Sequence, residues 1–331
     1  MTKKIVPVSF DAQLTWNYRV SNGTLADLYE RSKRAQWNAA TDIDWSIPVD
    51  YGKALPEGSV LGAISFANSP FATRGRPAWD MFRWEFQNWM VSQFLHGEQA
   101  AMIAAARLSE AMPDIECKLY AASQGADEAR HVEAFSRYVE AGLPEPYRVS
   151  GPLEALMQDL LTDSRWDITA LGMQVLIEAL AMAAFRTADA MFNDDLIKQI
   201  ARLVARDEAR HLTFGITSLR GVYGELTSAE LRERETFALD AAHLMRRRFL
   251  LEDIWERMDV PRDRGVHYAA TDPVLTAYRH TIFTKIISAL SQIGLMTSRV
   301  RDGLVSLGLM DPARAEPQRP HHLDAGATAG A

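Results

Sequence analysis

The chain has 331 residues, a net charge of −7 and a single cysteine, Cys117. This length allows one large domain or two small ones with a sizeable core, and the 47% hydrophobic and 24% charged residues are ordinary for a globular protein. There is no basic stripe for nucleic acid, no apolar run long enough for a signal peptide, and no uncharged run of membrane-spanning length. One cysteine cannot form an internal disulfide, which suits a reducing compartment. We therefore expect a cytoplasmic protein that binds neither nucleic acid nor membranes.

The N-terminal part of the chain predicts one helix and a long irregular segment. The helix is expected to begin at a capping box formed by Thr24 and Asp27. Residues 39–76 are rich in Pro, Gly, Ser and Asn, which is typical of a segment that wraps around other elements. We group residues 1–76 as this helix and wrapping segment.

Helical periodicity dominates from about residue 77, and alternating β-branched runs are scarce. Prolines, glycines and capping residues, among them a second capping box of Thr227 and Glu230, divide this part of the sequence into helices. The expected ranges are about 77–110, 113–142, 150–163, 167–192, 195–224, 227–258 and 273–308. We see no internal linker in residues 77–308, which therefore predict one all-α domain, whereas residues 309–331 have the low-complexity composition of a disordered tail.

The pentapeptide DEARH occurs twice, at residues 127–131 and 207–211. In each copy a Glu and a His stand three positions apart, so both side chains lie on one face of a helix. A single copy could be a solvated helix face with local ion pairs. However, a further Glu precedes each copy by 30 positions, Glu98 in the first case and Glu178 in the second, and both lie in apolar helical sequence. A carboxylate in such surroundings is costly to bury unless it is paired or binds a metal.

The spacing of these acids predicts two helical hairpins. Pro113, a predicted helix break, is the midpoint between Glu98 and Glu128, and the second pair of acids is arranged in the same way around Asn193. Each acid is about 15 residues from its turn, or roughly 22 Å along a helix. Folding each pair into a hairpin brings its two carboxylates to the same height, and two hairpins packed face to face form a four-helix bundle.

The centre of that bundle would hold four carboxylates and two imidazoles. They belong to Glu98, Glu128, His131, Glu178, Glu208 and His211. This inventory matches the dimetal site of ferritin-like bundles, in which two helices each supply a Glu and the other two each supply Glu-x-x-His. Four carboxylates balance two divalent cations, and oxygen with imidazole ligands suits iron or manganese. The sequence therefore predicts a ferritin-like four-helix bundle, with additional N-terminal and C-terminal helices, that binds two iron ions or one manganese and one iron ion.

The other polar letters of the pentapeptide predict support for these ligands. Asp127 and Asp207 each precede a ligand glutamate and could accept the free N–H of the histidine in the opposite hairpin. Arg130 and Arg210 follow three residues later and could keep the aspartates ionised. Local ion pairs at the surface are the alternative interpretation.

The doubled motif with its upstream acids resembles the hydroxylase subunits of bacterial multicomponent monooxygenases, within a wider group that includes ribonucleotide reductase small subunits. The resemblance covers about residues 80–215. It implies that the six residues bind the metals, that O₂ is the co-substrate, and that a reductase or ferredoxin donates electrons. Three positions depart from relatives in that group. Phe135 stands where reductase small subunits place a radical tyrosine, Met182 where the hydroxylases carry a threonine, and Val204 where aryl-amine N-oxygenases carry an additional histidine ligand.

The resemblance also implies a dry cavity beside the metals. We expect residues one turn from the ligand glutamates to line it, although ordinary core packing is the alternative for each of them. These residues are Phe94, Ala101, Met102, Phe135, Gln174, Ala181, Met182 and Phe185.

The leading functional hypothesis is an O₂-dependent di-iron monooxygenase that hydroxylates a small, mainly apolar organic substrate. N-oxygenation of an amine is the first alternative. A ferroxidase or other iron-handling protein and a radical-generating subunit are alternatives from different classes. A homodimer is left open by the sequence.

Overall fold

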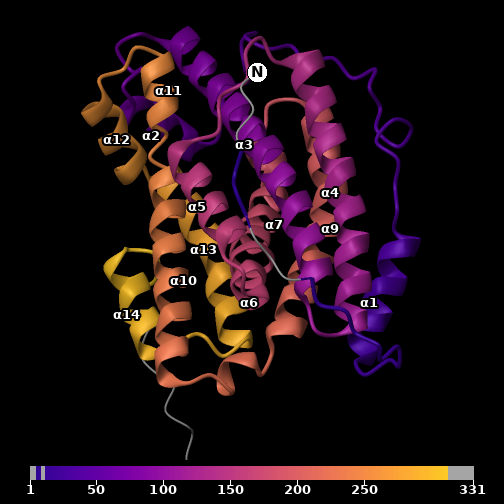
Figure 1. The fold of residues 1–331 in the computed structure, drawn as a ribbon. Coiled ribbons are helices and arrows are strands. Elements are labelled where there is room, and N and C mark those ends of the chain that lie inside the picture. The colour runs from indigo at the N-terminus through magenta and orange to yellow at the C-terminus, as the bar shows by residue number, and fades with distance from the viewer. Residues whose placement is uncertain (1–4, 9–11, 312–331) are drawn as a thin grey trace, which may run out of the picture.

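The computed structural model describes residues 5–8 and 12–311, so most of the predicted tail lies outside the described residues. Every regular element of the described part is a helix, and no strand occurs there (Figure 1). The predicted all-α class is therefore confirmed.

Four long helical stretches form the centre of the molecule and build two hairpins (Figure 1). The first hairpin pairs α3 with α4, the second pairs α7 with α9, and α4 packs against α9 to join them. Their bounds are Arg76–Ala111 for α3, Ile115–Gly142 for α4, Trp166–Ala170 for α6, Leu171–Ile177 for the π-helical segment η1, Glu178–Arg186 for α7 and Asp195–Leu219 for α9.

Local sequence accounts for the ends of these helices. Pro77 lies in the first turn of α3, after Gly75 in the left-handed region (φ 82°), and α3 ends before Pro113. At the start of α9, the Asp194 side chain accepts a hydrogen bond from the backbone N–H of Ile197 at 3.0 Å. Both turns of the two hairpins therefore lie where the sequence predicts them.

Shorter helices surround this bundle. Helix α1 packs on α4 and α9, α13 packs on α7, and α10 packs on α5. The bounds are Gly23–Arg34 for α1, Val60–Asn68 for α2, Gly151–Thr162 for α5, Ala188–Met191 for α8, Val222–Gly224 for the 3₁₀ turn η2, Ser228–Arg248 for α10, Glu252–Arg257 for α11, Arg262–Thr271 for α12, Pro273–Gln292 for α13 and Ser298–Ser306 for α14.

The prediction for the N-terminal part was wrong in two details. Asn22, not Thr24, caps α1, because its side chain accepts a hydrogen bond from the N–H of Leu25 at 3.2 Å. The segment predicted to be irregular contains α2, which Ser59 caps by accepting from the N–H of Gly62. The Thr227–Glu230 capping box of α10 is present as predicted.

Two helices predicted to be continuous are divided in the structure. The helix expected at 227–258 breaks where Leu251 takes a positive φ of 58°, and the turn buries Leu251 and Trp255 in the core. The helix expected at 273–308 is divided because α13 ends at Gln292. Gly294 follows with a φ of 82°, and the N–H of Leu295 donates to the carbonyl of Leu290 at 2.9 Å. The sequence analysis also missed α12, because tertiary packing rather than a strong local pattern defines it.

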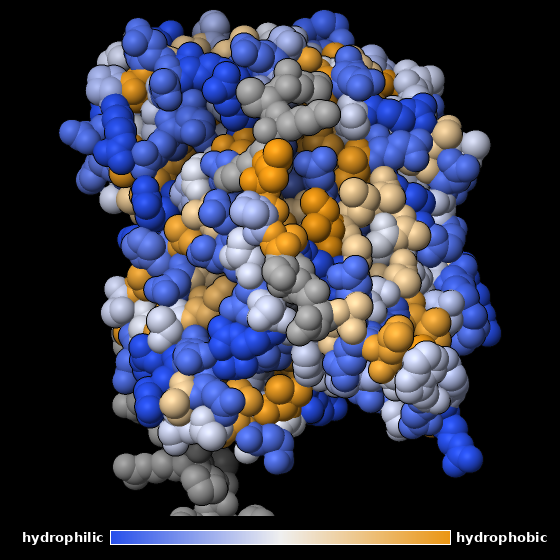
Figure 2. All heavy atoms as spheres, in the orientation of Figure 1, coloured by the Kyte–Doolittle hydropathy of each residue, from blue (hydrophilic) through white to orange (hydrophobic). Residues whose placement is uncertain are grey.

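One helical stretch, Trp166–Arg186, is long and apolar enough to cross a membrane, but 94% of its apolar window is buried inside the protein. This stretch is therefore a core helix of the second hairpin. Hydrophilic residues cover much of the face drawn in Figure 2, with apolar groups gathered near its middle.

We expect Gly215→Ala to lower the free energy of unfolding by about 1–3 kcal/mol, because an added Cβ would meet the Cβ of Gln174 at 2.5 Å and its backbone at 3.1 Å. Gly125→Ala is the matched control in another core helix, since its Cβ would meet only the Ala105 side chain at 4.0 Å. This control should leave stability unchanged or raise it by up to about 1 kcal/mol. Chemical denaturation measures both, and equal effects would contradict the close approach of α9 to η1.

Candidate metal centre

The structure brings together the six residues predicted to bind metal. Helix α3 supplies Glu98, α4 supplies Glu128 and His131, α7 begins with Glu178, and α9 supplies Glu208 and His211. Each side chain is buried, and none of the six residues is more than 6% exposed. Four helices from two hairpins thus place four carboxylates and two imidazoles in one dry region.

The two imidazoles each face three carboxylates through Nδ1. His131 Nδ1 lies 3.2 Å from Glu98 Oε2, 3.2 Å from Glu128 Oε2 and 3.3 Å from Glu208 Oε1.

His211 Nδ1 lies 3.2 Å from Glu128 Oε1, 3.4 Å from Glu208 Oε2 and 3.7 Å from Glu178 Oε1. Glu128 and Glu208 therefore face both imidazoles with different oxygens, whereas Glu98 approaches only His131 and Glu178 only His211. Glu128 and Glu208 could therefore be shared between two cations, whereas Glu98 and Glu178 would each serve one.

The donor set fits two divalent cations. One ligand atom from each of Glu98, Glu128, His131 and Glu208 lies within 4.8 Å of the others, and a second group joins Glu128, Glu178 and His211 in the same way. Both carboxylate oxygens of Glu208 and Nδ1 of His211 are buried without a hydrogen-bond partner. Buried polar atoms of this kind are rare unless another group satisfies them, and a metal ion at each position would do so.

The charges of the cluster shift the pKa values of its members. Burial raises the pKa of the Glu98 and Glu178 carboxyls well above the usual range, and the charge of Glu208 adds to the effect. Burial opposes protonation of His211, but the charge of Glu128, the hydrogen bond to Asp127 and the charge of Glu208 outweigh it and raise its pKa to about 10. The metal-free cluster therefore compensates its carboxylates with protons.

The aspartates of the two pentapeptides bond the histidines crosswise. Asp207 Oδ2 lies 3.1 Å from Nε2 of His131, and Asp127 Oδ2 lies 3.2 Å from Nε2 of His211. Each aspartate accepts the Nε2–H of a histidine in the opposite hairpin, which directs Nδ1 at the carboxylates as the nitrogen available to a metal ion. The geometry is the one that the sequence predicts.

The arginines of the pentapeptides connect the two aspartates. Arg130 lies 2.5 Å from Asp127 and 3.4 Å from Asp207, while Arg210 donates to Asp207 and lies 3.5 Å from Asp127. Burial would raise the pKa of Asp127, but the hydrogen bond to His211 and the charge of Arg130 hold it well below the usual range. The arginine side chains are only 14% and 13% exposed, so these are not ion pairs of a solvated surface.

Sequence reasoning missed three residues that contact this network. The indole N–H of Trp37 donates to Asp207 Oδ2 at 2.8 Å, and Gln36 Nε2 donates to Asp127 Oδ1 at 2.9 Å. Gln124 Nε2 donates to Glu128 at 2.9 Å and to Glu178 at 3.0 Å. Gln124 stands one turn before Glu128, a spacing that could have identified it. Gln36 and Trp37 follow α1, far away in sequence, and no local signal marks them.

The residues predicted to line a cavity are mostly packed. The rings of Phe94, Phe135 and Phe185 form a cluster, with centroids 4.5 Å apart for Phe94–Phe185 and 5.8 Å apart for each of the other two pairs. Ala101 and Met182 are also buried, whereas Met102 and Ala181 are partly exposed. A pocket of about 220 Å³ with several aromatic residues in its wall is lined by none of the eight residues.

Gln174 differs from the other seven. It is fully buried, and both its amide oxygen and its amide nitrogen lack a hydrogen-bond partner. It lies in η1, one turn before Glu178, in a π-helical segment that the sequence analysis took for ordinary α-helix. Its cavity-lining role stays a prediction.

The bundle and its cluster define the class of ferritin-like dimetal carboxylate proteins, as the sequence predicts. Residues 19–294 match the family described as P-aminobenzoate N-oxygenase AurF. The match spans most of the chain, and the chain belongs to this family. No curated protein sequence matches it.

Solved structures of an R2-like ligand-binding oxidase share the fold. A variant with anaerobically reconstituted Mn/Fe cofactor is 20% identical, with a TM-score of 0.55, over 83% of this chain and 95% of that chain. The same mutant of that oxidase, with aerobically reconstituted Mn/Fe cofactor, is 20% identical to this chain, with a TM-score of 0.54, over 82% of this chain and 94% of that chain. These likenesses support the ferritin-like fold.

We expect the metal-free protein to lose stability as the pH rises from about 6 to 9. The carboxyls of Glu98 and Glu178 and the imidazoles of His131 and His211 have raised pKa values, so the folded chain holds protons that the unfolded chain releases. The loss begins above the ordinary pKa of each group and is complete only above its raised pKa.

Thermal unfolding of chelator-treated protein across this pH range tests the expectation. Added Fe(II) or Mn(II) replaces the protons and should raise Tm most at the alkaline end. A Tm of the metal-free protein that increases steadily from pH 6 to 9 would contradict the proton-compensated cluster.

Proposed function

We propose that the protein is a dimetal oxygenase that uses O₂ to oxygenate a small organic substrate, and that the nitrogen of an amine is the atom attacked. The observation that supports an oxygen-activating centre is the convergence of two imidazoles and four carboxylates in a dry bundle core. The N-oxygenase family of the chain supports nitrogen rather than carbon as the target.

The proposed ligands are Glu98, Glu128 and His131 for one metal and Glu178, Glu208 and His211 for the other, with Glu128 and Glu208 shared. The chemistry that two iron ions, or one manganese and one iron ion, supply in such a site is reductive activation of O₂.

The residues of the chain would orient the metal ligands and exclude water from the centre. Asp127 and Asp207 fix the histidine tautomers, and the arginines keep both aspartates ionised, so Nδ1 stays available as a ligand. The Phe94, Phe135 and Phe185 rings form an apolar layer along the bundle from Glu98, which excludes water from one side of the centre.

Carbon hydroxylation, the leading hypothesis from sequence, becomes the alternative. The family match favours N-oxygenation, but Val204, fully buried, occupies the position at which the sequence comparison expects an additional histidine ligand in aryl-amine N-oxygenases. One metal position here would therefore have one imidazole fewer, and we place the difference between this chain and those enzymes in the ligand set of that metal.

The proposed oxygenase reaction also requires a partner that donates electrons. Two electrons per turnover require a donor, for which we propose a reductase or ferredoxin. A homodimer and a cytoplasmic location stay predictions from the sequence.

We predict that Glu128→Ala and His211→Ala each abolish loading of at least one metal and lower Tm relative to loaded wild type, because metal binding contributes to folding. Glu133→Ala on the exposed face of α4 is the matched control and should load normally. Elemental analysis after reconstitution with Fe(II), alone or with Mn(II), measures the effect. Two metals per chain in both variants would contradict the ligand assignment.

We predict that the reduced, iron-loaded protein incorporates ¹⁸O from ¹⁸O₂ into the nitrogen substituent of an aryl amine such as 4-aminobenzoate. Mass spectrometry of the product, with Glu128→Ala as the inactive control, tests the reaction. Oxidation of iron in proportion to O₂ while the amine stays unchanged would favour the ferroxidase alternative, and label in a C–OH group would favour hydroxylation.

A further inference from the structure

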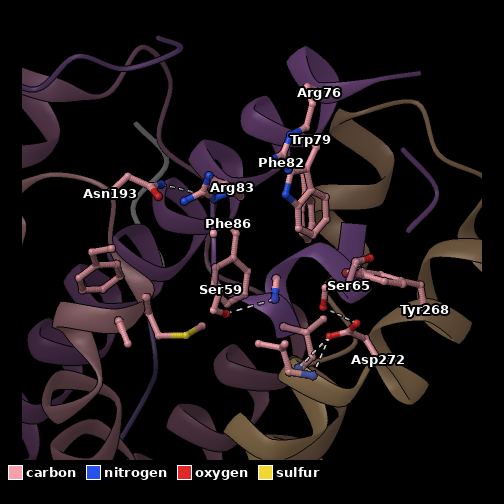
Figure 3. A pocket seen from close by; sticks show the side chains of 17 residues that line it. Ser59, Ser65, Arg76, Trp79, Phe82, Arg83, Phe86, Asn193, Tyr268 and Asp272 are labelled. Atoms are coloured by element: carbon pink, nitrogen blue, oxygen red, sulfur yellow. Dashed lines mark hydrogen bonds between the residues drawn. The ribbon is translucent and has the colours of Figure 1, made fainter. Parts of the chain in front are cut away.

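A pocket of about 220 Å³ lies between α2, the first turns of α3, residues 190–193 at the end of α8 and the start of α13 (Figure 3). Helix α2 and the start of α3 lie at the end of the molecule away from α14 (Figure 1). No residue proposed to bind metal lines it. A volume of this size is enough for a small organic molecule.

Aromatic rings form much of the pocket wall. Trp79, Phe82 and Phe86 come from successive turns of α3, Phe192 comes from the turn before α9, and Tyr268 comes from α12. Trp79 and Phe82 stack with centroids 5.2 Å apart and an interplanar angle of 30°. Such a wall favours a flat apolar body over a branched one.

Two guanidinium groups give the pocket a positive edge. Arg76 and Arg83 are seven residues apart, so they project from the same side of α3, and Figure 3 shows both beside the aromatic residues. Arg76 lies 3.6 Å from Glu57, whose side chain is 93% exposed, and Arg83 lies 3.5 Å from Asp80. The Arg76–Glu57 pair is long and open to solvent, so it is weak and leaves Arg76 able to bind an anionic ligand. The side chains of the Arg83–Asp80 pair are only 27% and 13% exposed, and Nη1 of Arg83 also donates to the carbonyl of Pro56 at 3.1 Å. An anionic ligand would therefore bind Arg83 through its remaining N–H groups.

The one carboxylate in the pocket wall is already fully engaged. Asp272 Oδ1 accepts the backbone N–H groups of Val274 and Leu275, both at 3.0 Å, and Oδ2 accepts the Ser65 hydroxyl at 2.5 Å. Its charge also faces the N-terminus of the 20-residue helix α13, which favours negative charge. Asp272 therefore does not cancel the positive edge.

The pocket shares a wall with the aromatic layer of the bundle. Phe192 lines the pocket, and its ring lies 6.3 Å from that of Phe94. The ring of Phe94 in turn lies 4.5 Å from that of Phe185, in a tilted arrangement, and Phe94 stands one helical turn before Glu98. Ring contacts thus lead from the pocket wall to the helical turn that precedes a proposed metal ligand.

We propose that this pocket binds a small aromatic carboxylate, with the ring against Trp79 and Phe86 and the carboxylate at Arg83 and Arg76. In the same proposal, the pocket is the first binding site on the path that the substrate takes to the metal centre. The second part of this inference rests on the proposed oxygenase function. The first part stands on the pocket alone.

Binding of 4-fluorobenzoate and of neutral 4-fluorobenzamide to the full chain, followed by ¹⁹F NMR, tests the site without reference to activity. The benzoate should bind more tightly than the benzamide. Arg83→Gln should weaken benzoate binding about tenfold, in keeping with one charge-assisted hydrogen bond, while Arg220→Gln, an exposed arginine outside the pocket, should not. Equal binding of both probes, or benzoate binding unaffected by Arg83→Gln, would overturn the proposal.

Gly62→Phe is designed to fill the pocket from its α2 wall. Gly62 lies in α2, and an added Cβ meets only Ser59 Oγ, at 3.8 Å. This variant should abolish benzoate binding in metal-free protein and, in loaded protein, raise KM for the amine substrate with kcat unchanged. Unchanged benzoate binding would refute the site, and an unchanged KM would refute the path.

The outcome for the pocket is separable from that for the proposed function. Benzoate binding that depends on Arg83, in a protein that oxygenates no amine, would keep the site and reject the oxygenase. Oxygenation that Glu128→Ala abolishes and Gly62→Phe leaves unchanged would keep the oxygenase and reject the path.

Discussion

Four carboxylates inside one dry bundle set the main constraint on this structure. In a medium of low dielectric constant they cannot all stay ionised unless positive charge enters with them. Without metal, protons on Glu98, Glu178 and the two histidines supply that charge, at the cost of a cluster that leaves both oxygens of Glu208 without a hydrogen bond. The bundle therefore holds a polar cluster that its own residues do not fully satisfy, and this need is the strongest physical reason to assign it to metal binding.

The same cluster connects the two hairpins. Asp207 of α9 bonds His131 of α4, Asp127 of α4 bonds His211 of α9, and the arginines link both aspartates. Each hairpin thus supplies the aspartate that orients the histidine of the other hairpin. The imidazoles are therefore correctly oriented only when α4 packs against α9. The outer helix α1 adds its own hydrogen bonds to this network through residues that follow its last turn.

Much of the core could be predicted from the sequence because its signals are local and repeated. Two identical pentapeptides, two upstream acids and two turns at their midpoints are enough to place Glu98 beside Glu128 and Glu178 beside Glu208. The sequence-based predictions fail where packing between residues far apart in the sequence determines the structure. Leu251 has a left-handed backbone conformation, and Trp255, four residues later, is buried. No sequence pattern near Leu251 predicts this conformation. Trp37 reaches Asp207 across 170 positions, which no spacing rule covers. The division at residues 76 and 308 into an N-terminal segment, a bundle domain and a tail stays a prediction.

The residues that follow α1 make the surroundings of the two pentapeptides unequal. The aspartate of each copy bonds the histidine of the other copy, so these contacts are the same in both directions. Only one side receives an indole, since Trp37 donates to Asp207, while Asp127 receives the amide of Gln36. The histidine held by Asp207 and the histidine held by Asp127 therefore have different surroundings, although the pentapeptides that supply them are identical. Two residues outside the repeat are enough to make its two copies inequivalent.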